Sequence, residues 1–413
     1  MSELIEKAIK LKNAAKVLGG LSSEDKNASL GRMADCLLNE KDWILEENAK
    51  DIEAGRKKGL SESLLDRLLL TRDRIDGIVD GIRQLIELED PIGETIESWE
   101  RPNGLQIRTV RVPLGVVGMV YEARPNVTVD AGSLCLKAGN AVLLRGSSSA
   151  LNSNKALVEV MQRALAGSKI PSDAVQLLED TSREMAAQMF KLNQYLDVLI
   201  PRGGAGLIQS VIHNATVPVL ETGVGNCHVL VDETAQEKMA VEIAVNAKLH
   251  RPSVCNAAES LLIHEKWPFV SELLNVLHEK GVELRGDERL CGEYSFVKEA
   301  VDVDWGTEFL APVLAIKLVK DVAEAIDHID RYGTKHSEAI ISENTENVGL
   351  FFKQVDAAVL YHNASTRFTD GEQFGYGAEI GISTQKLHAR GPMGLKAITT
   401  TKALVLGTGQ VRV

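Results

Sequence analysis

The sequence has few of the features that mark secreted or membrane proteins. It contains only five cysteines, an odd number, and no two of them have CxxC spacing. Scattered cysteines of this kind are typical of reduced thiols in the cytoplasm rather than of a disulfide framework. No apolar run is long enough to span a bilayer, and the first residues carry acids where a signal peptide has bases. We therefore expect a cytoplasmic protein.

Positive charge is also scarce. The chain has 46 Lys and Arg against 58 Asp and Glu, a formal net charge of −12. This balance argues against a nucleic-acid or anionic-membrane partner. The nine histidines show no HExxH or other metal-ligand spacing, so the sequence predicts no metal site. A chain of 413 residues is long enough for two or three domains with large cores that need no disulfides.

The pattern of apolar residues predicts helices, a hairpin and two β/α regions. Residues 1–90 have apolar positions at helical spacing. Residues 96–112 alternate polar and apolar side chains around an Asn-Gly turn, which predicts a β-hairpin. In 115–220 and again in 228–360, short apolar runs alternate with helix-like segments, which is typical of mostly parallel sheets covered by helices. A late strand is expected at 402–406.

Cys255 is the most informative residue of the chain. His250 and Arg251 precede it closely. A thiol with basic neighbours is a candidate nucleophile, because the thiolate attacks carbonyl carbons and nearby positive charge favours the thiolate. Glu221 is a carboxylate that the fold could bring beside this thiol to move protons. A free cysteine taken alone is more often a small buried core residue, so the hypothesis depends on the rest of the chain.

Two segments that follow predicted strands have the composition of phosphate-binding loops. Gly203 and Gly204 lead into a predicted helix, and glycines there let a phosphate approach the helix N-terminus. Arg145, Ser147 and Ser148 offer one guanidinium and hydroxyl groups to a phosphate. The alternatives are a tight strand-to-helix turn for the first segment and a serine N-cap for the second. The sequence contains neither a complete GxGxxG nor a Walker-type motif.

Two further segments carry polar groups that suit an anion. Asn126 follows a predicted strand, and its amide could donate a hydrogen bond to a developing oxyanion, although an asparagine in an ordinary turn is commoner. Lys386, His388 and Arg390 share the loop 381–392 with hydroxyls and glycines. In an acidic protein such a loop suits an anionic ligand, and the alternative is a plain surface loop.

In their order along the chain, these pieces resemble the aldehyde dehydrogenase superfamily over essentially the whole sequence. Residues 112–128 resemble its strand and loop before and around the oxyanion asparagine. Glu221 and Cys255 match its acid/base glutamate and its nucleophile in order and spacing. Residues 308–312 resemble the segment whose glutamate holds the nicotinamide ribose. Residues 381–395 resemble a signature of a reductase branch that acts on an acyl phosphate.

The resemblance implies an α/β fold with two Rossmann-like parallel-sheet domains and a small hairpin and tail element. It assigns cofactor binding to 1–95 and 113–226, catalysis to 227–372, oligomerisation to the hairpin 96–112 and the tail strand 400–413, and a substrate or anion loop with a returning helix to 373–399.

The implied activity is NADPH-dependent reduction of γ-glutamyl 5-phosphate to glutamate 5-semialdehyde, with release of phosphate, through a thioester on Cys255. This is the second step of proline biosynthesis. The expected catalytic residues are Cys255, Asn126 and Glu221. The residues expected to bind NADP(H) are Arg145, Ser147, Ser148, Gly203, Gly204 and Glu308, and those expected to bind substrate anions are Arg251, Lys386, His388 and Arg390. Ordinary aldehyde dehydrogenases have lysine and glutamate where this chain has Arg145 and Ser148, and the change favours the 2′-phosphate of NADP.

The implied partners are further copies of the chain, in a homodimer or a dimer of dimers, and a glutamate 5-kinase that makes the acyl phosphate. Two other functions are compatible with the residues. One is an acylating aldehyde dehydrogenase that transfers its acyl group to coenzyme A. The other is a catalytically silent ligand-binding protein that kept the fold.

Overall fold

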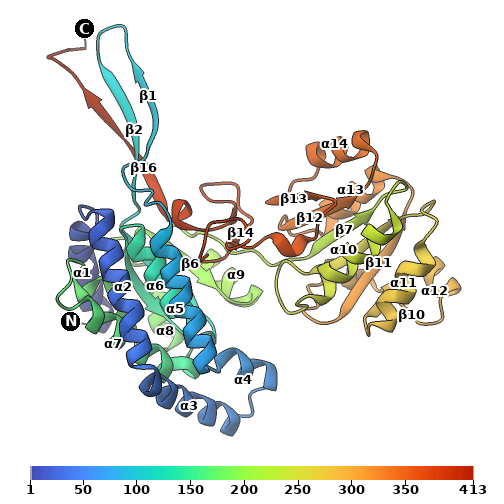
Figure 1. Cartoon of the computed structure of the whole chain (residues 1–413), viewed down its shortest axis with the longest axis horizontal. Coiled ribbons are helices and arrows are strands. Elements are labelled where there is room, and N and C mark those ends of the chain that lie inside the picture. Colours follow the sequence, from blue (N-terminus) through green and yellow to red (C-terminus); the bar gives the residue numbers. More distant parts are fainter. Residues whose placement is uncertain (1, 413) are drawn as a thin grey trace. The chain divides into compact units, whose positions relative to one another are not determined.

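The computed structural model describes residues 2–412 (Figure 1), so the predicted tail 400–413 ends one residue outside the described part. The chain forms two compact units. The first contains residues up to 221, 375–381 and 393 onward, and the second contains 222–374 and 382–392. The observed division therefore falls at 221/222, and the segment predicted as one loop, 373–399, is shared between the units.

Five helices form the N-terminal part of the first unit, as the helical spacing predicts. Each buries one apolar stripe; in the fifth helix the stripe is Ile75, Ile78, Val79, Ile82 and Leu85. The Ser22 side chain accepts a hydrogen bond from Asp25 N at the start of the second helix, which fixes where that helix begins. The helices are α1 (Glu3–Leu18), α2 (Ser23–Asn39), α3 (Lys41–Lys57), α4 (Glu62–Leu68) and α5 (Arg72–Glu87).

A four-stranded parallel sheet forms the core of the first unit, in the order β5-β4-β3-β6. Its strands are β3 (Val116–Tyr121), β4 (Ala141–Arg145), β5 (Val175–Leu177) and β6 (Val198–Arg202). Its helices are α6 (Asn126–Lys137), α7 (Leu151–Leu165), α8 (Arg183–Phe190) and α9 (Ala205–Asn214), with short 3-10 helices η1 (Ser148–Ala150) and η2 (Ser172–Ala174). The β3 side chains are all buried, which explains their uninterrupted apolar run.

A separate antiparallel sheet joins the predicted hairpin to the predicted tail strand. Its order is β1 (Thr95–Glu100), β2 (Gln106–Pro113) and β16 (Thr399–Leu406). Gly104 adopts φ 83°, a left-handed conformation that glycine enters without steric cost, at the turn between β1 and β2. The β1 side chains are all exposed, including Trp99.

The second unit is built on a seven-stranded parallel sheet with the order β10-β9-β11-β8-β7-β12-β13. The strands are β7 (Cys227–Val231), β8 (Ala258–His264), β9 (Glu283–Gly286), β10 (Val297–Glu299), β11 (Val313–Val319), β12 (Ser337–Ile341) and β13 (Val359–His362). The helices are α10 (Glu237–Leu249), α11 (Val270–Glu279), α12 (Glu288–Glu293), α13 (Val322–Tyr332) and α14 (Thr345–Gln354), with η3 (Asp302–Gly306) and η4 (Thr366–Phe368).

Both faces of this sheet are buried. Val229 and Ile263 pack in one core with α10 and α11, while their strand neighbours Leu230 and Leu262 pack in another with α13 and α14. The two helix-covered parallel sheets confirm the predicted α/β class.

The last segment differs from the predicted returning helix. It forms a short antiparallel pair, β14 (Ile382–Ser383) with β15 (Gly391–Pro392), and then only a four-residue 3-10 helix, η5 (Leu395–Ile398). Gly391 adopts φ 86° and Pro392 follows it, so a regular helix cannot form before 393. No helix among residues 2–412 is long and apolar enough to cross a membrane.

Candidate functional site

In the first unit, three predicted segments lie at the same edge of the sheet. Asn126 follows β3, Arg145 ends β4, and Gly203 and Gly204 follow β6. The three strands are parallel neighbours, so their carboxyl ends meet. The chain runs outward from β3 to β4 and β5 and then returns to place β6 on the other side of β3. A crevice at such a reversal is where parallel α/β sheets bind ligands.

At this edge of the sheet, a carboxylate of the protein lies at the N-terminus of α9. Gly204 N donates a 3.0 Å hydrogen bond to Glu122 Oε2. A Cβ on Gly203 would lie 2.6 Å from the Glu122 carboxyl carbon, so only glycine allows this approach. The N-terminus of α9 is thus a place where a phosphate could bind, but in this structure the Glu122 carboxylate occupies it. Glu122 lies in the segment 112–128 that resembles the oxyanion loop of the family, but no role was predicted for it.

Arg145 has a structural role, and its cofactor-binding role stays a prediction. Its Nη2 donates to Thr181 O at 2.5 Å and to Ser182 O at 3.3 Å. Burial lowers the pKa of Arg145. Its Nε is buried and has no hydrogen-bond partner among the described residues, which leaves one donor for a ligand. The Ser147 hydroxyl lies 2.8 Å from that of Ser149 and caps η1, as the structural alternative predicts, whereas Ser148 is exposed.

Asn126 is the first residue of α6, and its amide is engaged within the helix. Its Nδ2 donates to Asp130 Oδ2 at 2.9 Å, one helical turn later. Burial raises the pKa of Asp130 to about 6, and the hydrogen bond from Asn126 acts in the opposite direction. Asp130 thus fixes the orientation of the asparagine amide, a role that could not be foreseen from the sequence.

In the second unit, Cys255 lies in the loop between α10 and β8, in tight contact with the segment before β7. A Cβ on Gly225 would lie 1.4 Å from Cys255 O. The Cys227 thiol donates to the same carbonyl at 3.2 Å, and Gly225 N donates to Glu308 Oε1 at 2.9 Å. The structure therefore brings the predicted Cys255 and Glu308 to the amino end of this sheet. Glu221 immediately precedes this segment and belongs to the first unit.

A fully buried ion pair joins the two ends of the loop that carries Cys255, residues 250–257, which we call the nucleophile loop. Lys248 Nζ, just before the loop, lies 2.5 Å from Glu259 Oε2, just after it, and neither side chain is exposed. Burial raises the pKa of Glu259 and lowers that of Lys248, while each charge opposes the effect on its partner. Glu259 Oε1 also accepts from Leu310 N at 3.3 Å, close in sequence to Glu308. Removing one partner of such a pair leaves an uncompensated buried charge.

A second arginine reaches the nucleophile loop from the segment after β13. Thr366 Oγ1 donates to Asn256 O, and Asn256 Nδ2 donates to Thr369 O, both at 2.8 Å. Between these two contacts, the half-buried Arg367 donates from Nε to His250 Nδ1 at 3.3 Å. Sequence reasoning found the exposed Arg251 of this loop but missed Arg367, since 111 positions separate Arg367 from Asn256.

The predicted anion loop is tied to a carboxylate of the same unit. Lys386 Nζ lies 2.8 Å from Asp356 Oδ2, Arg390 Nη2 lies 2.7 Å from Oδ1, and Lys335 Nζ lies 3.4 Å from Oδ2. The hydrogen bonds from Lys386 and Arg390 hold the pKa of Asp356 well below its usual range. The structure thus brings two predicted cations together and adds Lys335 and Asp356. His388 is exposed at the turn of the loop, with φ 71°.

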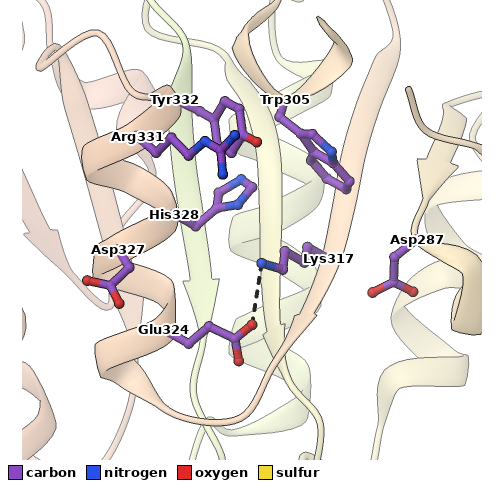
Figure 2. Close-up of a pocket in the computed structure, with 8 residues that line it drawn as sticks. All are labelled: Asp287, Trp305, Lys317, Glu324, Asp327, His328, Arg331 and Tyr332. Atoms are coloured by element: carbon purple, nitrogen blue, oxygen red, sulfur yellow. Dashed lines mark ion pairs between the residues drawn. The ribbon is translucent and has the colours of Figure 1, made fainter. Parts of the chain in front are cut away.

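A hollow of about 220 Å³ lies elsewhere in the second unit, between α13, η3 and β11 (Figure 2). His328 is buried in its wall, and its Nε2 has no partner among the described residues. Burial, with nearby positive charge, lowers the pKa of His328 to about 3. None of the predicted site residues lines this hollow. Asn226, next to Gly225, donates to the backbone oxygens of its wall residues Trp305 and Tyr332 at 2.8 Å, so the wall and the segment before β7 are connected.

Comparison with known proteins shows which family the chain resembles over its whole length. The model of the aldehyde dehydrogenase family matches residues 2–288. Gamma-glutamyl phosphate reductases from Geobacillus sp. (strain WCH70) and from Halalkalibacterium halodurans are 70% and 64% identical to the chain, and each alignment covers 100% of both proteins. The crystal structure of gamma-glutamyl phosphate reductase from Thermotoga maritima, 51% identical, superposes with a TM-score of 0.98 and covers 100% of both chains.

The family match spans more than half of the chain, and the curated relatives align with it from end to end. The chain therefore belongs to the aldehyde dehydrogenase family of oxidoreductases.

Proposed function

We propose that this protein reduces γ-glutamyl 5-phosphate to glutamate 5-semialdehyde with NADPH and releases phosphate, as in the second step of proline biosynthesis. The observation that carries the proposal is the surroundings of Cys255. Its loop contains Arg251 and receives Arg367 from a distant segment, so the candidate nucleophile lies among cations. Cations favour the thiolate and suit an anionic acyl donor. The end-to-end similarity to gamma-glutamyl phosphate reductases supports the same substrate.

The chemistry needs a nucleophile and an oxyanion site. The Cys255 thiolate attacks the acyl carbon, a carbon–sulfur bond forms, and the bond from carbon to the phosphate oxygen breaks. Phosphate leaves with the electron pair and takes up a proton. The amide of Asn126 and the backbone N–H of Cys255 donate hydrogen bonds to the oxyanion on the acyl carbon. Glu221 accepts and returns the thiol proton.

Bound NADPH supplies the hydride that the thioester carbon accepts. The carbon–sulfur bond then breaks, and the aldehyde leaves as Cys255 returns to the thiolate. In the first unit, the unpaired donor of Arg145 and the exposed Ser148 hydroxyl fit a phosphorylated dinucleotide, and the glycine N–H groups before α9 fit it once Glu122 has moved away from Gly204. In the second unit, Glu308 fits the hydroxyls of the nicotinamide ribose. We assign most of the cofactor contacts to the first unit, and Glu308 and the nucleophile to the second.

The three-stranded sheet is our proposed self-association surface. Its outer strands, β1 and β16, each have one unpaired edge, and they expose the apolar residues Ile96, Trp99, Val405 and Leu406. Open edges with exposed apolar side chains favour pairing with another chain. We propose a cytoplasmic homodimer or dimer of dimers. A glutamate 5-kinase is the partner that would supply the acyl phosphate.

The reverse reaction tests the proposed function. Glutamate 5-semialdehyde, supplied as pyrroline-5-carboxylate, is mixed with NADP⁺, and the nicotinamide absorbance is followed with and without phosphate. Cys255→Ala is compared with Cys291→Ala, which removes a partly buried cysteine of α12 in the same unit. We expect phosphate-dependent reduction of NADP⁺ by the wild type and by Cys291→Ala, and none by Cys255→Ala.

Two results would contradict the proposal. Reduction that requires coenzyme A in place of phosphate would make the protein an acylating aldehyde dehydrogenase. Nucleotide binding without turnover, and without selective alkylation of Cys255, would make it a ligand-binding protein.

A further inference from the structure

The segment after β13 is held in place by three contacts that do not depend on a ligand, one with β12 and two with the nucleophile loop. The strand β13 pairs with β12 up to His362, and the chain then runs back, so that Thr369 Oγ1 lies 2.7 Å from the hydroxyl of Ser337 at the start of β12. The hydrogen bonds of Asn256 to Thr366 and Thr369 fix the same segment beside Cys255. The backbone of Arg367 is therefore positioned by its neighbours, and its side chain is free to serve a ligand.

The guanidinium of Arg367 has unused donors. Within the described residues, its hydrogen bond goes from Nε to His250, and no ion pair joins it to a carboxylate. Burial lowers the pKa of Arg367, and the negative charges of Asp370 and then of Cys255 act in the opposite direction. A half-buried guanidinium with free Nη groups is the fork that binds phosphate oxygens in pairs.

The cations of the predicted anion loop, unlike Arg367, are paired with a carboxylate. Lys386 and Arg390 both donate to Asp356, which also attracts Lys335. Their charge is partly neutralised, and their side chains are oriented toward that carboxylate. These contacts anchor the loop 382–392, whereas Arg367 lies against the loop that carries Cys255 and has no such carboxylate partner among the described residues.

On this basis we propose that Arg367 binds the phosphate of the substrate and holds it as it leaves. The inference rests on the proposed function and adds a phosphate-specificity residue to it. As the acyl carbon–oxygen bond breaks, the electron pair moves onto the phosphate, and Arg367 stabilises that added negative charge until a proton is taken up. In reverse, Arg367 orients phosphate for attack on the Cys255 thioester.

Steady-state kinetics of the reverse reaction test this role. Arg367→Gln and Arg367→Lys are compared with Arg289→Ala, which removes a surface arginine that is paired with Glu265 at 2.9 Å in the same unit. For Arg367→Gln we expect the KM for phosphate to rise by about tenfold or more, since a charged, bidentate contact is lost. The lysine variant should fall between it and the wild type, because lysine keeps the charge but lacks the planar fork. Arg289→Ala should match the wild type.

The KM for the semialdehyde distinguishes phosphate binding by Arg367 from a role in binding the rest of the substrate. We expect it to stay within about twofold of wild type in both Arg367 variants, since the aldehyde carries no phosphate, and thermal unfolding temperatures serve to detect loss of the fold. An unchanged KM for phosphate overturns the inference. So does a rise confined to the KM for the semialdehyde, which would assign Arg367 to the substrate carboxylate. Phosphate dependence of the wild type is measured separately, so failure of the proposed function is distinguishable from failure of this inference.

Discussion

Gly225 offers a direct test of how closely the loop geometry controls the reaction. A Cβ at this position would lie 1.4 Å from Cys255 O and 2.3 Å from its carbonyl carbon, whereas real Cβ atoms essentially never come within 3.0 Å of another atom. Both obstructing atoms belong to the backbone, so no side-chain rotation relieves the overlap. In Gly225→Ala, the nucleophile loop or the segment before β7 must move by about 1.6 Å.

A displacement of this size predicts a large catalytic loss. Misplacement of a reacting group by about 1 Å costs on the order of 10²-fold in rate, so kcat/KM for the reverse reaction should fall at least that far. NADP⁺ binding, measured by fluorescence titration, should change less than kcat/KM, because Glu308 is the one proposed cofactor residue that Gly225 is shown to contact. Gly349→Ala in α14 is the matched control, because a Cβ there meets nothing within 4 Å. Near-normal kcat/KM in a folded Gly225→Ala protein would refute the reasoning.

Three further predictions concern single titratable groups. The pKa of His328 is about 3 in the folded protein and 6.5 in the unfolded chain, so the protein loses stability as the pH falls below 6.5. In His328→Gln, the difference in unfolding free energy between pH 8 and pH 5 should therefore be smaller by about 2 kcal/mol. Urea titrations that give the same difference for both proteins would argue against this prediction. Glu122→Gln should tighten NADP⁺ binding several-fold, because it removes an anion from the α9 N-terminus, and weaker binding would show that Glu122 assists the cofactor. Asp356→Asn should speed trypsin cleavage after Lys386 or Arg390, since both lose a charged anchor, and unchanged cleavage would count against that anchoring role.

Periodicity predicts the fold class well because the signals are local. Fully buried strands such as β3 appear as continuous apolar runs, and the hairpin is marked by its Asn-Gly turn. The prediction of a returning helix within 373–399 was wrong, because the left-handed Gly391 and the following Pro392 form a strand pair with β14 instead of a helical turn. The division of 373–399 between the two units also depends on contacts between distant residues, which no local pattern encodes.

The candidate site was predictable only where a residue type carries its own chemistry. Cys255 and Glu308 are brought to the same end of the sheet, and the basic loop contains the expected cations. The residues that orient them were not predictable. Arg367 reaches the nucleophile loop from a distant segment, Asp356 gathers Lys386 and Arg390, and Glu122 bonds to a glycine N–H that follows another strand.

The interleaving of the two units has a consequence for the order of folding. The first unit takes its strand β16 from the last part of the chain, where Thr399 pairs with Pro113 of β2. During synthesis, β2 must therefore wait with one edge unpaired until almost the whole chain has left the ribosome. The second unit must likewise wait for 382–392. The first unit can therefore be completed only after every residue of the second has been made, and a nascent chain that stops short of β16 exposes a strand edge that is open to aggregation.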